Sequence, residues 1–250
     1  MEKFKKWYFI LLLISLTSNG QQKTIIPTKG IVVFNCTEEI YDLKLYENSK
    51  KEFLKSLIQG TNNAMKKERS EIEFQTDSII MNSVIEESSS FFIDELFSKK
   101  DMKFYIEYND TLVTKKEIKD NIDQQVVIIN SNTRKFKNEL TEGIYDASEI
   151  KILNFKENKN NTKIINGYKC FKVEYSFVET DSNDEDFNKF MSNFTINRKM
   201  WVTDKIKSSF HPIINDNEIL EKYYPLEIVE YSDSMKGLIT TYKLDKLDIK

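Results

Sequence analysis

The chain has 250 residues, of which 31% are charged and 40% hydrophobic, and its formal net charge is −3. A weakly acidic chain without a block of basic residues argues against nucleic acid as the main partner. Six glycines and three prolines are too few for a linker or a low-complexity chain.

Residues 1–20 have the pattern of a secretory signal peptide. Three lysines precede an apolar run at residues 7–16, and small residues follow at positions 18 and 20. This order predicts cleavage between Gly20 and Gln21. An apolar run of about ten residues is too short to cross a bilayer core of roughly 30 Å. We therefore expect an exported protein, in the periplasm or outside the cell of a Gram-negative organism, with no transmembrane segment in residues 21–250.

A strand and then a helix are predicted at the start of the mature chain. Residues 30–36, GIVVFNC, are rich in β-branched and aromatic residues, which favours a strand. Ser49 and Glu52 form the S-x-x-E capping box that marks a helix start. Apolar residues recur at helical spacing over residues 49–69, at Phe53, Leu54, Leu57, Ile58, Ala64 and Met65. Because amphipathic helices normally turn their apolar face to the core, we expect this helix to cover a sheet.

From Ile72 onward the pattern is that of strands, although residues 88–97 fit a short helix or a loop equally well. The predicted strands lie in residues 72–77, 103–114, 124–136, 164–177, 197–206, 224–231 and 238–244. An acidic loop is predicted at residues 178–190. Strands that do not alternate with helices argue against a parallel sheet, and tight turns favour an antiparallel one. The predicted fold is mainly β (α+β). It is a single domain, with a curved antiparallel sheet or open half-barrel and one main N-terminal helix packed on one face.

The stretch IINGYKCFKVEYSF predicts a hairpin in detail. Asn166-Gly167 is a favoured pair for a type I′ turn, which needs positive φ at both residues. A two-residue turn places Lys163 opposite Cys170 and Thr162 opposite Phe171. Alternation then puts one apolar set on one face, comprising Phe171, Val173, Tyr175 and Phe177.

Cys36 and Cys170 are the two cysteines. In an oxidising compartment an even number of cysteines favours a disulfide. The alternative is two separate buried thiols, which pack as small hydrophobic groups. Both interpretations stay open, because a sequence does not give the distance between the two Cα atoms.

No catalytic, cofactor-binding or metal-binding residue is predicted. His211 is the only histidine and precedes a proline, so we expect it in an extended surface loop. The acidic loop resembles a calcium loop at Asp181, Asn183 and Glu185. Its sixth position is Asp186 and its twelfth is Ser192, where that motif needs Gly and Glu. Trp201 stands among polar neighbours, as a half-exposed cross-strand aromatic or as a platform for a ligand.

Three stretches together resemble the secreted GLPGLI family: TKIINGYKCFKVEYSF, KMWVTDKI and YYPLEIVEYSDSMKGLITTYKL. Family members have a T-K-x-I-x-G-Y-x-C hairpin, matched here by Thr162, Lys163, Ile165, Gly167, Tyr168 and Cys170. Their W-Y-T-x-x-I strand is matched by Trp201, Thr203 and Ile206, with Val202 in place of an aromatic and Lys207 in place of a proline. Pro225, Leu226 and Ile228 stand where the naming hexamer would fall, although the hexamer itself is absent. The resemblance covers about the last hundred residues.

The resemblance implies no known activity. It implies an architecture similar to that of periplasmic lipoprotein carriers, in which a curved sheet and a helix enclose an apolar cavity for acyl chains. We therefore expect a non-catalytic envelope or secreted protein that binds an apolar or lipid-like ligand and needs no cofactor. The alternative is a structural or interaction protein of the envelope without a small ligand. A carboxylate-based hydrolase is less favoured, because the sequence shows no recognisable nucleophile, base or metal set. A carboxylate pair is defined by its separation in space, which the sequence does not give.

Overall fold

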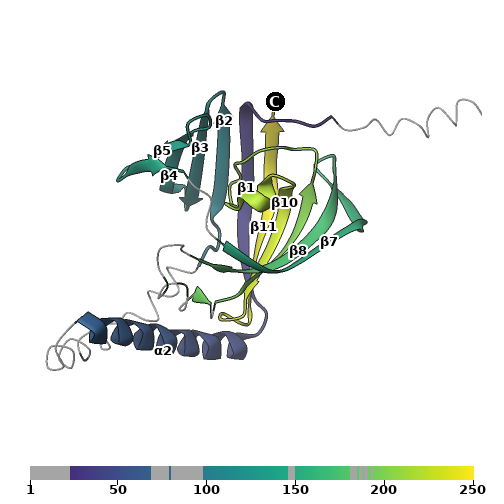
Figure 1. The fold of residues 1–250 in the computed structure, drawn as a ribbon. Coiled ribbons are helices and arrows are strands. Elements are labelled where there is room, and N and C mark those ends of the chain that lie inside the picture. The colour runs from purple at the N-terminus through teal and green to yellow at the C-terminus, as the bar shows by residue number, and fades with distance from the viewer. Residues whose placement is uncertain are drawn as a thin grey trace, which may run out of the picture.

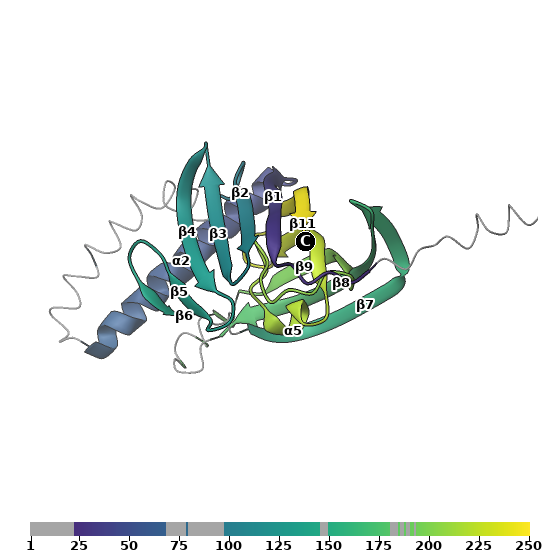
Figure 2. The ribbon, with the colours of Figure 1, turned by 90° about the horizontal axis from the view of Figure 1, so that it is seen from above.

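The computed structural model describes residues 23–68, 79, 98–145, 150–180, 185, 188, 191–192 and 194–250, with side chains 57–68 left out. Its main feature is an antiparallel sheet of 11 strands in the order β6-β5-β4-β3-β2-β1-β11-β10-β9-β8-β7. The sheet curves strongly around one face, and its edge strands β6 and β7 do not meet (Figures 1 and 2). The prediction of a mainly β fold with an open antiparallel sheet is confirmed.

The strands have the following bounds: β1 (Lys29–Ile40), β2 (Lys103–Asn109), β3 (Leu112–Lys119), β4 (Ile122–Asn130), β5 (Lys135–Lys137), β6 (Glu142–Ile144), β7 (Ile150–Ile165), β8 (Tyr168–Glu179), β9 (Ile196–Thr203), β10 (Tyr224–Ser232) and β11 (Leu238–Ile249). The strand β1 occupies the centre of the sheet. It pairs with β2 on one side and with β11 on the other.

The β7–β8 hairpin forms as predicted from its turn. Asn166 and Gly167 have φ values of 47° and 82°, the positive values that a type I′ turn requires. The register places Lys163 opposite Cys170 and Thr162 opposite Phe171. The sequence therefore sets both the turn type and the pairing in this part of the sheet.

The concave face of the sheet is covered by the segment between β9 and β10, residues 204–223, which includes the short helix α5 (Asn217–Leu220). Asp216 caps α5, because its side chain accepts hydrogen bonds from the backbone N–H groups of Glu218 and Ile219. Apolar residues of this segment join one buried cluster with side chains of the sheet, among them Phe210, Ile214 and Ile219 with Phe34, Ile106, Val173 and Met200. A loop thus takes the place that the sequence assigns to the N-terminal helix.

The helix α2 (Leu43–Glu68) begins six residues before the predicted start. The Asp42 carboxylate accepts a hydrogen bond of 2.9 Å from the Leu45 N–H, as an N-cap side chain does. Ser49 instead lies inside the helix, where its hydroxyl bonds to the carbonyl oxygens of Tyr46 and Lys236. The prediction that the Ser49–Glu52 capping box starts the helix is therefore wrong.

The helix α2 passes below the lower end of the sheet in Figure 1. The Ser49 hydroxyl joins it to the β10–β11 turn at Lys236, at 3.1 Å. The ring of Phe53 lies 5.3 Å from that of Phe194, between their centroids. Because these contacts are with the end of the sheet, the predicted packing of the helix over one face is not confirmed.

Several predictions of the sequence fall outside the described residues. These are the signal peptide of residues 1–20, the strand at 72–77, the undecided segment 88–97 and most of the acidic loop. Among the helices that are described, none is long and apolar enough to cross a membrane.

Candidate functional site

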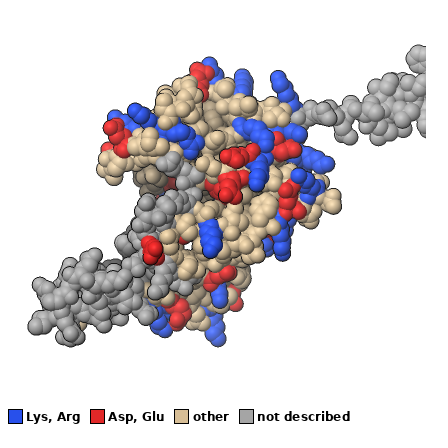
Figure 3. Space-filling view, in the orientation of Figure 1, with Lys and Arg blue, Asp and Glu red and all other residues tan. Residues whose placement is uncertain are grey.

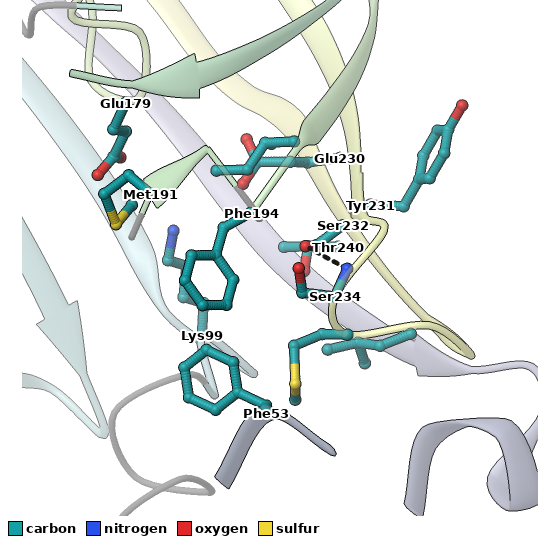
Figure 4. Close-up of a pocket in the computed structure, with 13 residues that line it drawn as sticks. Phe53, Lys99, Glu179, Met191, Phe194, Glu230, Tyr231, Ser232, Ser234 and Thr240 are labelled. Atoms are coloured by element: carbon teal, nitrogen blue, oxygen red, sulfur yellow. Dashed lines mark hydrogen bonds between the residues drawn. The ribbon is translucent and has the colours of Figure 1, made fainter. Parts of the chain in front are cut away.

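A cavity of about 480 Å³ lies at the lower end of the sheet, where α2, the residues before β9 and the β10–β11 hairpin meet (Figure 4). Its apolar lining is formed by Phe53, Met191, Phe194, Ile196, Met235 and Leu238. Its polar lining is formed by Lys99, Glu179, Glu230, Tyr231, Ser232, Ser234 and Thr240. The site thus combines segments that are far apart in the sequence.

The turn between β10 and β11 holds the apolar side of the cavity in place. Gly237 has a φ of 87°, and a Cβ atom there would lie 2.4 Å from the carbonyl oxygen of Asp42. This close approach lets the Gly237 carbonyl accept a 2.9 Å hydrogen bond from the N–H of Tyr41. Only glycine fits at this position, so the turn and the start of α2 are tied together. Met235, in the same turn, is buried against the cavity.

A buried ion pair borders the cavity on the sheet side. The Arg198 Nε donates to the Glu230 carboxylate at 2.7 Å, and the two side chains are 14% and 15% exposed. The Arg198 Nη1 also donates to the Tyr175 hydroxyl at 3.0 Å, and its guanidinium lies 4.4 Å from the ring centroid of Phe177. Arg198 is therefore held by three side chains of the concave face.

Each charge of this pair keeps the other group ionised. Burial by itself would raise the pKa of Glu230, but the charges of Arg198 and Lys99 outweigh it and hold the pKa below its ordinary value. Burial would likewise lower the pKa of Arg198, but Glu230 and Tyr175 raise it. Both groups are therefore ionised at neutral pH.

Lys99 brings a second cation to the cavity. Its backbone N–H donates to the Glu38 carboxylate at 2.8 Å, which fixes this part of the chain to β1. Its ammonium donates to the hydroxyl of Tyr242 at 3.2 Å. Tyr242 is only 1% exposed, so the Lys99 ammonium contacts a buried hydroxyl although Lys99 as a whole is exposed.

His211 is completely buried, so the prediction of a surface loop at this residue is wrong. Its Nδ1 accepts hydrogen bonds of 3.0 Å from the N–H groups of Ile213 and Ile214. The proton of the neutral ring is therefore on Nε2, which donates to the Pro225 carbonyl at 3.0 Å. Burial lowers the pKa of His211 to about 3. Because both ring nitrogens are bonded to backbone groups, His211 is not placed to act as a general base.

Cys36 and Cys170 are both buried free thiols, so the interpretation as two separate thiols is supported and the possible disulfide is not. Cys36 belongs to the cluster on the concave face, whereas Cys170 alternates with the residues of that cluster on β8 and packs in a second cluster. The strands β1 and β8 are four places apart in the sheet, which is roughly 19 Å at the usual strand spacing. A disulfide needs Cα atoms within about 7 Å.

Both thiols should be unreactive in the folded protein. Burial raises the pKa of Cys36 to about 12 and that of Cys170 to about 11, and the thiolate is the reactive form. With 5,5′-dithiobis(2-nitrobenzoic acid) at pH 8 we expect no rapid reaction of the native protein and two thiols per chain after unfolding. A chain that shows no thiol after unfolding would contradict the free cysteines.

Trp201 is half-buried on the convex side of β9. The Lys163 ammonium lies 4.7 Å from its ring centroid and is paired with the Glu227 carboxylate at 2.9 Å. Since Lys163 occupies this side of the ring, a cross-strand packing role is favoured over a ligand platform.

A second cavity, of about 660 Å³, lies at the opposite end of the sheet and is more polar. Two of its hydrogen-bonding groups are already bonded to the protein. The Lys207 ammonium donates to the carbonyl oxygens of Glu221 and Lys222. The Tyr108 hydroxyl donates to the backbone carbonyl oxygen of Phe210. The lower cavity is therefore the stronger candidate for a binding site.

On the face of the molecule that Figure 3 shows, basic and acidic side chains are interspersed. Within the described ranges, no group of three or more His, Cys, Asp or Glu side chains is placed to hold a metal ion. Comparisons with models of protein families, with curated proteins and with solved structures found no match. Membership of the GLPGLI family therefore stays a prediction, and the function has to be argued from the cavity.

Proposed function

We propose that the protein is an exported, non-catalytic binding protein that holds an apolar or lipid-like molecule in the lower cavity. The observation that carries the proposal is the composition of this cavity, whose surface is mainly apolar and in which six apolar side chains face seven charged or hydroxyl-bearing residues. Small-molecule sites typically have volumes of about 300–1,000 Å³ and this kind of lining. The cavity volume of about 480 Å³ lies within that range.

The proposed ligand lies at the end of the sheet rather than across its concave face. Residues 204–223 occupy the middle of that face, so an acyl chain has no room there. The ring pair of Phe53 and Phe194 forms one wall of the cavity, and such rings pack well against methylene groups. Export to the periplasm or the cell exterior, and kinship with GLPGLI proteins, belong to this proposal on the grounds of the sequence.

The two other candidate functions are less well supported by the geometry. A two-carboxylate hydrolase needs a general acid with a raised pKa, whereas the pKa of Glu230 in the cavity is lowered. An interaction protein without a small ligand is expected to expose an apolar or aromatic patch. The ring of Trp201 is half-buried and lies beside Lys163.

Filling the cavity should weaken binding of an uncharged apolar probe. Ile196→Trp places a large ring in the cavity and should raise the Kd of N-phenyl-1-naphthylamine by more than about tenfold. Excluding the probe from the apolar surface of only two methylene groups already costs about 1.6 kcal/mol. The measurement is the increase in probe fluorescence during titration of the purified, delipidated protein.

Ile164→Trp is the matched control, because Ile164 is 67% exposed on β7 and does not line the cavity. It should leave the Kd of the probe unchanged. Leu238→Trp fills the cavity from another strand and should repeat the effect of Ile196→Trp. Unchanged probe binding in both filled variants, with circular dichroism like that of the wild type, would refute the proposed site.

A further inference from the structure

We propose that the ligand of the lower cavity carries an anionic head group, such as a carboxylate, which is bound by Lys99. This inference rests on the proposed function and assigns the chemical class of the ligand. The apolar chain then lies against Phe53 and Phe194, and the head group lies at the Lys99 ammonium. In Figure 4 the side chain of Lys99 passes behind the Phe194 ring toward the end of the cavity that holds Glu179 and Glu230.

The first argument is the state of the two cations at the cavity. Arg198 is neutralised by Glu230, because its Nε lies 2.7 Å from that carboxylate. Lys99 donates to the neutral hydroxyl of Tyr242 at 3.2 Å. No carboxylate of the described residues lies within ion-pair distance of its ammonium. Lys99 is therefore the cation whose charge is available to a ligand.

The second argument is the position of that ammonium. The backbone bond to Glu38, of 2.8 Å, and the bond to the Tyr242 hydroxyl fix both ends of the Lys99 side chain. A charged donor that is already positioned loses little rotamer freedom when a ligand binds. Beside the buried Tyr242 hydroxyl it is also shielded less by water and salt than a cation on the open surface. A charge-assisted hydrogen bond at such a place is stronger than a neutral one.

One hydroxyl group of the cavity supports the same orientation. Thr240 lines it from β11, and its hydroxyl can donate to a carboxylate oxygen, whereas the Ser232 hydroxyl already donates to the Thr195 carbonyl. Two carboxylates also line the cavity. Glu230 is paired with Arg198, and Glu179 is exposed at the end of β8, where water weakens its field. The site therefore selects a carboxylate over an ammonium head group.

The test uses three ligands with the same twelve-carbon chain: dodecanoate, 1-dodecanol and dodecyltrimethylammonium. Each displaces N-phenyl-1-naphthylamine from the full protein, below its critical micelle concentration. For the wild type we expect dodecanoate to bind about tenfold more tightly than dodecanol, the contribution of one charge-assisted hydrogen bond. The cationic ligand should be the weakest.

Lys99→Met should raise the Kd of dodecanoate about tenfold relative to that of dodecanol. Lys99→Arg keeps the charge and should retain the preference for dodecanoate. Lys169→Met removes an exposed lysine of β8 that does not line the cavity and should change nothing.

Equal affinity for dodecanoate and dodecanol, or an unchanged preference in Lys99→Met, would overturn the assignment of an anionic head group to Lys99. If the probe still binds in that case, the proposed function stands. Tighter binding of the cationic ligand would overturn it as well and would point to Glu179. If the wild type fails to bind the probe, the proposed function and the head-group site fall together.

Discussion

Replacing Arg198 with methionine should lower the free energy of unfolding by about 3–5 kcal/mol, since it leaves the buried carboxylate of Glu230 without its partner. The Tyr175 hydroxyl loses the same guanidinium, which adds a smaller cost. Chemical denaturation at pH 7, followed by tryptophan fluorescence, gives the difference. The effect should be among the largest of any single substitution in this sheet.

The double variant Arg198→Met with Glu230→Leu removes both charges and keeps apolar side chains in their places, so it distinguishes the loss of charge pairing from the loss of packing. It should regain most of the lost stability, because a buried pair can often be exchanged for apolar residues at little cost. Lys55→Met is the exposed control, since Lys55 and Glu52 are both 72% exposed and such a pair contributes at most about 1 kcal/mol. A double variant as unstable as Arg198→Met would show that the carboxylate is not the cause.

Replacing His211 with alanine should lower the free energy of unfolding by about 3–5 kcal/mol. The substitution removes a ring that packs between Phe34 and Tyr224, at centroid distances of 5.0 and 4.9 Å. It also leaves the buried N–H groups of Ile213 and Ile214 without their acceptor. Denaturation at pH 7.5, where the wild-type ring is neutral in both states, measures the full effect.

The same residue should make stability depend on pH. The pKa of His211 is lowered to about 3 in the folded protein and is about 6.5 in an unfolded chain. Between these values the unfolded state binds a proton that the folded state does not. The stability that His211 provides is thus complete above about pH 6.5 and is lost as the pH falls toward 3, by up to about 1.4 kcal/mol per pH unit.

His211→Gln does not titrate and serves as the reference for this effect. The advantage of the wild type over His211→Gln should shrink as the pH is lowered from about 6.5. A difference that stays constant down to pH 4 would mean that the imidazole is not held neutral by burial. Comparing the two proteins removes the contribution of the carboxylates, which titrate in both.

The sequence predicted those parts of the fold that depend on neighbouring residues. The Asn166-Gly167 turn fixes the register of the β7–β8 hairpin, and alternation along β8 separates its buried face from the other. Both rules act over a few residues, so no knowledge of the rest of the chain is needed. The order of one helix among many strands was enough to exclude a parallel sheet.

The sequence did not predict those features whose burial depends on residues far away in the chain. Residues 204–223 have neither helical nor alternating periodicity, so nothing local marks them as the cover of the concave face. His211 can be buried because the carbonyl of Pro225, on β10, accepts a hydrogen bond from its Nε2–H. At α2 the Asp42 carboxylate accepts the N-terminal N–H bond, whereas the Ser49 hydroxyl, which was predicted to cap the helix, binds the β10–β11 turn at Lys236.

The cavity could not be predicted for the same reason. Phe53, Lys99, Phe194 and Leu238 come from four separate segments, and no local pattern brings them together. Apolar residues of this kind normally indicate core positions in a sequence. One usable signal was the glycine at 237, since an isolated glycine between two strands often marks a close approach of backbones.

The central position of β1 has a consequence for how the chain folds. Gly30 to Ile40 pair with Ile249 to Leu238, so the middle of the sheet joins residues that are about two hundred positions apart. Contacts of such high sequence separation are the slowest to form, because a long loop must close before they contribute. During synthesis the chain can assemble the hairpins on either side of β1, but β11 is needed to connect them. The last strand of twelve residues therefore completes the sheet, because β11 alone joins β1 to β10.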